Sequence, residues 1–342
     1  MPVRHANRVL LFALSAFCAA AFAVTAGSGA SHPHVQAVQQ LLSIPEPDVD
    51  FAAAKVTIDR LIDPHIDAEV TLRRIDEIAA EIRALVTFRS TTQQRAAALR
   101  SYLYDAGPWN KGQTFSYDFN DPLGRHLPNK LLANYLRTRK GNCVSMPFLY
   151  IALAQKLGLT VGAASSPRHV FVKLRDDHGT WHNIETVSGG WPRRDSLYHQ
   201  DAAMTPESIA SGIYMRPLGK RETVALMAAE LFQHHGDPGS ARPDVVIALA
   251  DVLLQHDPIN LDAMLSKGRA YYLIGKDRCV DTSMSSRKTN ERERQECIAL
   301  QRENIRWYEK AEKLGWREPP PEEEAKYLNM VKGVAESQNQ AR

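Results

Sequence analysis

The chain has 342 residues, a formal charge of +3, and hydrophobic and charged fractions of 44% and 24%. Such a chain is too long for one hydrophobic core, so we expect two or three domains in a soluble globular protein. The small net charge, carried by basic residues scattered along the chain, argues against a nucleic-acid-binding protein. The sequence contains no Walker A loop and no G-x-G-x-x-G, G-x-S-x-G or H-E-x-x-H motif. The common nucleotide-binding, serine-hydrolase and zinc-peptidase signatures are therefore excluded.

Residues 1–26 have the pattern of a signal peptide. Two arginines precede an apolar run, residues 9–22, which is too short to cross a bilayer comfortably and is followed by small residues. This run contains Cys18, which we expect to be removed with the peptide. The sequence thus predicts a periplasmic or secreted mature protein with no stable membrane span. The alternative is an uncleaved membrane anchor.

Three cysteines remain in the mature chain, an odd number for an exported protein. Cys279 and Cys297 lie close together in the sequence around a polar stretch, and we expect them to form a disulfide. Cys143 is then left as a free thiol. A free thiol in an exported protein calls for a chemical explanation.

Residues 27–104 are predicted to form a helical N-terminal region. A polar lead extends to about residue 50, and from Phe51 to Leu103 apolar side chains recur every three or four residues between charged ones. This period indicates amphipathic helices, the last of them from about Thr92 to Tyr104. The charged faces are most simply solvated surface, and we assign no chemistry to them.

Residues 108–129 change character, because Gly, Asn, Asp and Pro alternate there with aromatic side chains. A loop of this length inside a compact chain usually has a function. We expect it to line a substrate groove, with Tyr117 and Asn129 as candidate substrate-binding residues. A short helix over residues 128–137 is expected to follow.

The next motif, Gly141-Asn142-Cys143, opens an apolar helix that ends at Gly158. The unpaired backbone N–H groups and the dipole at a helix N-terminus favour an anion, so a thiol placed there ionises more readily. The backbone N–H of Cys143 is the simplest donor for an oxyanion, and Asn142 is a further candidate for the site. The alternative is a small buried cysteine that only caps a helix.

After Gly158 the apolar period changes to two, which predicts three antiparallel strands. The expected strands span residues 161–165, 169–174 and 181–187. An apolar helix followed by an antiparallel sheet indicates an α+β fold.

A thiol nucleophile needs a base, and the base needs an acceptor that orients it. His169 begins the second strand and is the candidate base. Glu185 lies in the third strand and is the candidate orienting residue, with Asn183 as runner-up. His182 is expected to face away from His169, and no second cluster of metal ligands accompanies it, so we predict no metal site.

The register of the second hairpin decides whether this pair meets. A three-residue turn at residues 176–178 places His169 directly opposite Glu185 on one face of the sheet. A two-residue turn at residues 177–178 would instead place His169 opposite Thr186. Gly179 suits the longer turn, which favours the first register.

Together these motifs resemble the transglutaminase-like superfamily of papain-fold cysteine enzymes. The similarity covers roughly residues 128–190, where Gly-Asn-Cys opens a helix, Pro-Arg-His-Val-Phe-Val resembles the histidine strand and Trp-His-Asn-Ile-Glu-Thr the strand of the third member. The resemblance implies an α+β transglutaminase core with Cys143 as nucleophile and His169 as base. It places Glu185 in the position usually held by aspartate. The superfamily includes peptidases, amidases and non-catalytic proteins, so the resemblance does not fix a substrate.

The C-terminal part is predicted to be helical over residues 221–234, 242–256, 261–274 and 290–314. Motifs at Gly268 to Tyr271 and at Tyr308 to Ala311 resemble the two helices of one tetratricopeptide repeat, but the stretch between them is about two dozen residues too long. The predicted disulfide would close this insertion and stabilise the fold by roughly 3 kcal/mol. The region could be a docking surface for a protein partner or a helical buttress for the core.

These patterns predict four segments: a signal peptide (1–26), an N-terminal helical region (27–104), a transglutaminase-like catalytic core (105–220) and a tetratricopeptide-like helical region (221–342). The predicted function is that of an exported cysteine peptidase or amidase. It would cleave an amide or peptide bond of a peptide or protein substrate through Cys143, His169 and Glu185, by a thioester acyl-enzyme and without a cofactor. The alternatives are a non-catalytic interaction protein and an acyl transferase that cross-links proteins.

Overall fold

The computed structural model describes Gly29, residues 31–237, 239–279 and 291–320, and, near the C-terminus, residues 322, 324, 325, 327–329 and 331. The predicted signal peptide and Cys18 therefore lie outside the described residues. Within the described part of the chain, no helix combines the length and the apolar character that crossing a bilayer requires.

Helices dominate the N-terminal part, as the sequence predicts. They are α1 (Pro33–Ser43), the short 3₁₀ helix η1 (Glu46–Asp48), α2 (Phe51–Ile62), α3 (Ala68–Arg83) and α4 (Thr92–Tyr104). Asp50 and Asp67 cap α2 and α3 by accepting backbone hydrogen bonds, and Thr91 forms a capping box at the start of α4. Helix α1 falls in the stretch that we expected to be a polar lead, although its buried Val35, Val38 and Leu42 have helical spacing.

The loop after α4 contains only short elements. They are the 3₁₀ helices η2 (Pro108–Asn110) and η3 (Leu127–Lys130), helix α5 (Leu132–Thr138), and the strands β1 (Ser116–Tyr117) and β2 (Lys140–Gly141). Strands β1 and β2 pair in parallel, so Tyr117 lies beside Gly141. The long loop is thereby brought against the turn that carries Cys143.

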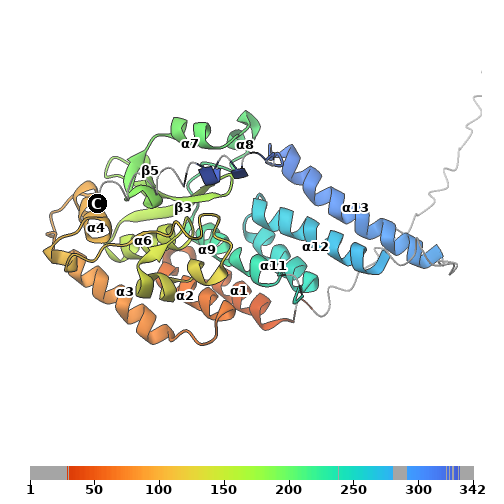
Figure 1. The fold of residues 1–342 in the computed structure, drawn as a ribbon, viewed down its shortest axis with the longest axis horizontal. Coiled ribbons are helices and arrows are strands. Elements are labelled where there is room, and N and C mark those ends of the chain that lie inside the picture. Colours follow the sequence, from red (N-terminus) through yellow and green to blue (C-terminus); the bar gives the residue numbers. More distant parts are fainter. Residues whose placement is uncertain are drawn as a thin grey trace, which may run out of the picture.

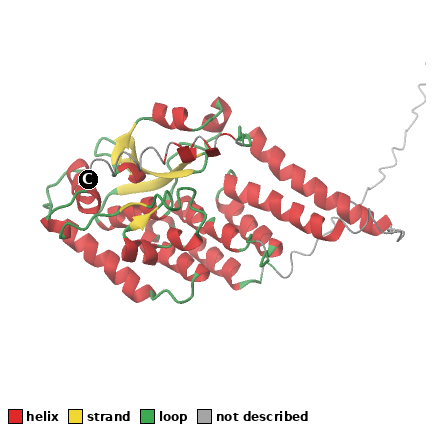
Figure 2. Cartoon of the chain, in the orientation of Figure 1, coloured by secondary structure: helices red, strands yellow, loops and turns green. Residues whose placement is uncertain are grey.

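Helix α6 (Ser145–Lys156) is buried on nearly all sides, as its almost continuous apolar sequence requires. It packs on one face of an antiparallel sheet in the order β3-β4-β5-β6 (Figures 1 and 2). The strands are β3 (Thr160–Ser166), β4 (His169–Arg175), β5 (Trp181–Glu185) and β6 (Trp191–Arg193). The α+β class and the three predicted strands are confirmed, whereas β6 was not predicted.

Short helices follow the sheet and cover its other side (Figure 1). They are α7 (Asp195–Asp201) and α8 (Pro206–Ala210), whereas the 3₁₀ helix η4 (Thr186–Ser188) lies between β5 and β6 and contacts α6. Side chains of Ala164 and Phe171, on this face of the sheet, form a second hydrophobic cluster with Tyr198 of α7. The opposite face, with Val172 and Leu174, belongs to the main core around α6.

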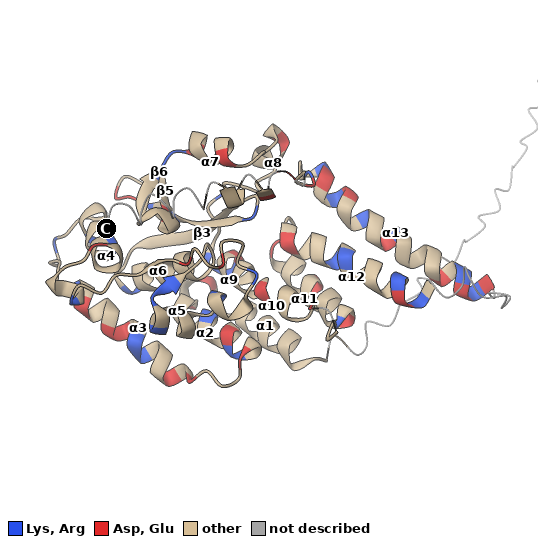
Figure 3. Cartoon of the chain, in the orientation of Figure 1, with Lys and Arg blue, Asp and Glu red and all other residues tan. Residues whose placement is uncertain are grey.

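The C-terminal helices are α9 (Lys220–Ala228), α10 (Glu230–His234), α11 (Pro243–His256), α12 (Leu261–Cys279) and α13 (Glu291–Lys313). Helices α12 and α13 pack side by side and extend away from the sheet (Figure 1). The predicted disulfide between Cys279 and Cys297 is confirmed, with a Cα–Cα distance of 6.0 Å, and residues 280–290 between them lie outside the described residues. Acidic and basic side chains alternate along α13 (Figure 3), in keeping with the small net charge.

A buried ionic network joins the N-terminal helices to the rest. The ammonium group of Lys55, which has no exposed side-chain surface, pairs with Asp59 and with Oε2 of Glu230 at 3.1 Å, and donates to the carbonyl of Lys130 at 3.1 Å. The second oxygen of Asp59 accepts the N–H of Leu132 at 2.7 Å. A buried charge is tolerated only when it is paired and hydrogen-bonded, so this network depends on every member.

We expect Lys55→Ala to lower the free energy of unfolding by roughly 3–5 kcal/mol, because it leaves two buried carboxylates without their cation. The matched control is Lys276→Ala, on the exposed surface of α12, which should change stability by less than about 0.5 kcal/mol. Urea unfolding followed by circular dichroism measures both. Equal stability of the two variants would show that the network does not hold the helices together.

Candidate active site

Cys143 lies in a tight turn two residues before α6. Gly141 is required there, because a Cβ atom would lie 2.6 Å from the ring of Tyr135 and 2.7 Å from the hydroxyl of Ser145. The side-chain oxygen of Asn142 accepts the N–H groups of Val144 and Ser145 at 3.0 and 3.1 Å. Asn142 thus satisfies the first donors of the helix and fixes the thiol at its N-terminus.

The turn between β3 and β4 places a carbonyl group against this thiol. Ser166 pairs with His169, which leaves a two-residue turn of Pro167 and Arg168. Arg168 has a φ of 59°, in the left-handed region that glycine usually occupies after proline in such a turn. The Sγ atom of Cys143 lies 3.9 Å from the carbonyl oxygen of Arg168.

The second hairpin has a register different from both that the sequence suggested. Arg175 pairs with Trp181 and Lys173 with Asn183, so the turn comprises Asp177, His178 and Gly179. The expected turn at residues 176–178 is therefore wrong by one residue, and the pairing is shifted by two. Gly179 is therefore the last residue of the turn rather than the first residue after it. Its φ of 85° lies in the left-handed region, which glycine adopts without strain.

A shift of two residues preserves the face on which each side chain lies. His169 and Glu185 therefore still share a face, but they are diagonal neighbours rather than directly opposite. The Nε2 atom of His169 lies 2.8 Å from Oε2 of Glu185. Diagonal positions are farther apart than direct ones, so the additional methylene of glutamate, compared with aspartate, supplies the reach.

The carboxylate of Glu185 is almost completely buried, with 2% of its side chain exposed. The Tyr198 hydroxyl donates to Oε2 at 2.9 Å, the N–H of Val187 donates to Oε1 at 3.3 Å, and Nη1 of Arg193 lies 3.9 Å from Oε2. Each oxygen thus has at least one donor, which allows the charge to remain buried. Tyr198 and Arg193 were not identified from the sequence, because they lie on α7 and β6, two elements that were not predicted.

The electrostatics of the pair favour an imidazolium. Burial alone would lower the pKa of His169, but the Glu185 carboxylate and the side chain of Cys143 outweigh it and raise this pKa to about 10. Burial would raise the pKa of Glu185, but His169, Tyr198 and the N–H of Val187 keep it below its usual value. Because Nε2 of His169 is engaged with Glu185, Nδ1 is the nitrogen left for the hydrogen bond with Cys143.

A thiol at a helix start, an imidazole and a buried carboxylate are therefore contiguous. Residues 69–223, from α3 to α9, match the family model of the transglutaminase-like superfamily. These residues form a transglutaminase-like domain. Members of this superfamily often have cysteine hydrolase or transferase activity, and the resemblance drawn from the sequence is confirmed.

Two curated proteins are similar to a larger part of the chain. The UPF0162 protein of Xylella fastidiosa strain 9a5c is 24% identical over 217 residues, which cover 62% of this chain and 73% of that protein. The UPF0162 protein of Xylella fastidiosa strain Temecula1 has the same identity and coverage. Their names assign no activity.

Two other predicted site residues, Asn183 and Asn129, make their hydrogen bonds away from Cys143 and His169. Asn183 donates to the carbonyl of Arg193 at 2.9 Å and to Asp195 at 2.6 Å, so its amide group is engaged away from His169. Asn129 donates to Oδ2 of Asp121 at 3.0 Å and thereby supports the long loop. Asn183 thus holds the backbone of β6 at Arg193, and Asn129 holds the carboxylate of Asp121.

Tyr117, in contrast, lies close to the thiol. Burial raises its pKa, and so do Tyr327 and the charge of a Cys143 thiolate. The hydroxyl groups of Tyr117 and Tyr327 lie 3.0 Å apart, and each donates to the carbonyl of Pro122, at 2.8 and 3.2 Å. Tyr117 is thus the predicted loop residue that the structure brings to the site.

Tyr327 belongs to a C-terminal segment that passes over this part of the domain. Glu324 of the same segment accepts a hydrogen bond from Arg125 at 2.5 Å and pairs with Arg168 at 3.5 Å. Arg168 is the residue whose carbonyl faces the thiol. The described residues of the segment thus contact the loop of Arg125 and the turn whose carbonyl faces Cys143.

We expect Glu185→Asp to lower the pKa of His169, because the shorter side chain cannot maintain the diagonal hydrogen bond, and Glu185→Gln to lower it further by removing the charge. Each pKa unit corresponds to about 1.4 kcal/mol of lost interaction. Titration of the imidazole by NMR measures both shifts. Asp176→Asn is the matched control, since Asp176 binds the exposed His182 in the same hairpin at 2.7 Å. An aspartate variant with the wild-type titration would contradict this account of the side-chain length.

We expect Tyr327→Ala to raise the rate at which iodoacetamide alkylates Cys143, because the segment loses its hydroxyl contacts with Tyr117 and Pro122. A net hydrogen bond is worth about 1 kcal/mol, so the increase should be about fivefold. Tyr272→Ala, on the exposed surface of α12, is the control. An unchanged rate in the Tyr327 variant would show that the segment does not restrict access to the thiol.

Proposed function

We propose that this protein is an exported cysteine hydrolase that cleaves an amide or peptide bond. The observation that carries the proposal is the buried hydrogen bond between His169 and Glu185, with Cys143 on the remaining side of the imidazole. A catalytic triad needs these three roles in this order: nucleophile, base and orienting group. A merely structural cysteine would need neither partner.

In the first step, the thiolate of Cys143 attacks the carbonyl carbon of the scissile bond and forms a tetrahedral intermediate. The backbone N–H of Cys143, which donates to no described residue, is the proposed donor to the oxyanion. The imidazolium of His169 then gives its proton to the leaving amine. The C–N bond breaks, and a thioester of Cys143 remains.

In the second step, the neutral imidazole of His169 takes a proton from water, and the resulting hydroxide attacks the thioester. The carboxylic acid product leaves, and the thiolate and imidazolium are restored. Glu185 keeps its charge throughout, because it orients the ring and stabilises the imidazolium. We propose hydrolysis rather than transfer because nothing in the sequence points to a dedicated site for an acyl-accepting amine.

The C-terminal helices support the proposed site as a buttress. Trp307 and Ala311 of α13 belong to the same hydrophobic cluster as Phe171 and Tyr198, whose rings stack at 4.2 Å beside His169. This packing favours a stabilising role for α12 and α13, while their outer surface remains a proposed docking site for a protein partner. Export is proposed from residues 1–26, and the disulfide suits an oxidising compartment.

The proposal predicts that Cys143 is alkylated rapidly even at pH 6, because the raised pKa of His169 keeps the imidazolium beside it. His169→Ala should slow alkylation at that pH on the order of a hundredfold, since a free thiol with a pKa of about 8.5 is ionised by less than about 1% there. The ion pair of His169 and Glu185 is lost as the pH rises through the raised pKa of His169. As the pH falls, it persists until Glu185 is protonated, below the usual pKa of a glutamate.

The His169→Ala variant should also lose hydrolysis of a peptide library, followed by mass spectrometry, with Cys143→Ser as the inactive control. Among the described cysteines, Cys143 is the free one, so alkylation reports on it alone. If the wild-type protein and His169→Ala have the same pH profile, the catalytic proposal fails.

A further inference from the structure

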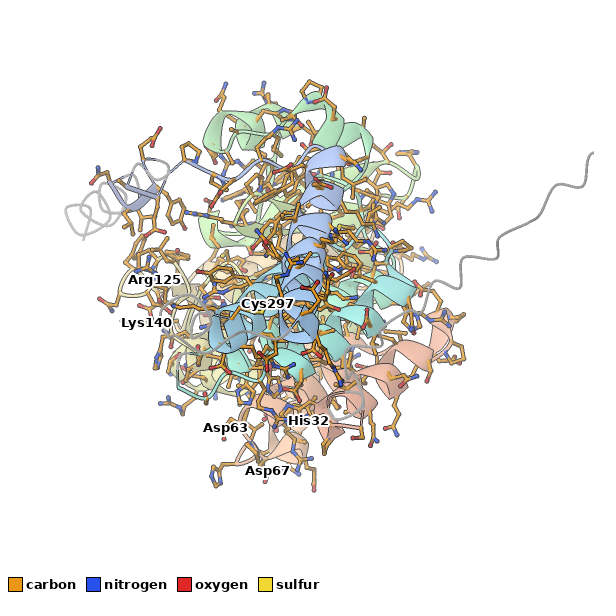
Figure 4. All side chains as sticks on the ribbon, turned by 90° about the vertical axis from the view of Figure 1, so that its right-hand side faces the viewer. His32, Asp63, Asp67, Arg125, Lys140 and Cys297 are labelled. Carbon is orange, nitrogen blue, oxygen red and sulfur yellow. A yellow bond between two sulfur atoms is a disulfide. The ribbon has the colours of Figure 1, made fainter. Side chains whose placement is uncertain are left out.

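Four histidines from two distant parts of the sequence gather in one cluster, and the proposed reaction uses none of them. His32 and His34 lie at the start of α1, and His234 and His235 at the end of α10. The ring centroids of His32 and His34 are 4.7 Å apart, and both rings lie within 5.2 Å of that of His235. Figure 4 shows His32 beside the N-terminal helices and away from Arg125.

We propose that His32, His34 and His235 bind one divalent transition-metal ion of the zinc class. One ring nitrogen of each can serve as a ligand, and these three atoms all lie within 4.8 Å of one another. In a tetrahedral zinc site with Zn–N bonds of 2.0–2.1 Å, ligand nitrogens are about 3.4 Å apart. The Nδ1 atom of His34 and Nε2 of His235 are already 3.0 Å apart, so only modest rotation of the third ring is needed.

The hydrogen bonds of the cluster must rearrange when a metal binds. The Nδ1 atom of His32 accepts the backbone N–H of His34 at 3.2 Å, so in the neutral ring Nδ1 holds the lone pair and Nε2 the proton. A metal would take the place of this N–H at Nδ1, or would bind Nε2 after the proton has moved to Nδ1. The backbone of His235 is held on both sides, because its N–H donates to Leu231 at 2.9 Å and its carbonyl accepts from Arg242 at 2.8 Å. The ligands therefore come from positions that the backbone already fixes.

The surroundings favour neutral imidazoles, which is the form that binds metals. Burial and the neighbouring imidazoles lower the pKa of His34 to about 4 and that of His235 to about 3. The nearby guanidinium of Arg242 is paired with Asp244 at 2.9 Å. Three imidazoles suit zinc, nickel or copper, with water or His234 in the remaining position.

Such a site would cross-link the start of α1 to the end of α10, since His34 and His235 are 201 residues apart in sequence. The backbone just before His32 already packs on the start of α11, since a Cβ atom on Gly29 would lie 2.3 Å from the carbonyl oxygen of Asp244. A metal would therefore fasten the beginning of α1 to the junction of α10 and α11. The expected role is structural, and it is separate from the chemistry at Cys143.

The experiment uses the mature chain without an affinity tag of histidines, in a Cys143→Ser background so that the thiol cannot bind the probe. Zinc ions are titrated against a chromophoric chelator, and the melting temperature is recorded with and without zinc. We expect one zinc per chain at micromolar concentration and an increase in melting temperature. Cobalt substitution should give the strong visible absorption of a tetrahedral site.

His34→Gln and His235→Gln should each weaken zinc binding by at least about a hundredfold, since even the loss of an outer partner costs 10- to 100-fold. The exposed His65→Gln is the matched control and should bind like the parent. His32→Gln, near the start of the described chain, provides a third ligand variant if either of the others fails to fold. The proposal is overturned if zinc binding does not saturate. It is also overturned if a folded ligand variant binds zinc as tightly as His65→Gln does.

Discussion

The hydrogen bond between His169 and Glu185 imposes the conditions that the rest of the site must meet. A carboxylate with 2% of its surface exposed is stable only if several donors replace the water it has lost. Tyr198 and the backbone of Val187 supply two of them, and His169 itself supplies the third. Because the charge is fixed in this way, the imidazole is both oriented and held protonated, which is what an adjacent thiolate requires.

The hydrogen bonds that stabilise the Glu185 carboxylate also depend on helices outside the transglutaminase-like domain. Tyr198 donates to Glu185 with its hydroxyl, while its ring stacks on Phe171 and belongs to a cluster that includes Trp307 of α13. The position of one hydroxyl group thus depends on helices that lie more than a hundred residues later in the chain. The C-terminal helices are therefore part of the support of the site.

The sequence predicted the parts of this site that depend on local patterns. The helix start at Cys143 and the strand that begins at His169 follow from turn residues and apolar period. The shared face of His169 and Glu185 follows from the choice of a three-residue turn over a two-residue turn. The register of the second hairpin was not predicted, because Gly179 is compatible with more than one turn and only the packed sheet selects among them. Tyr198 was missed because α7 is too short to show a period. The histidine cluster was missed because its two halves are brought together only by tertiary packing.

Arg168 shows why a locally unfavourable residue can suit this position. A left-handed conformation costs a residue with a side chain about 1 kcal/mol, and glycine would avoid that cost. The conformation itself directs the Arg168 carbonyl toward the thiol, and glycine would preserve this. Only an arginine also extends a guanidinium to the approach of the site, where Glu324 now pairs with it. The strained turn thus combines a backbone carbonyl beside Cys143 with a cation that pairs with the C-terminal segment.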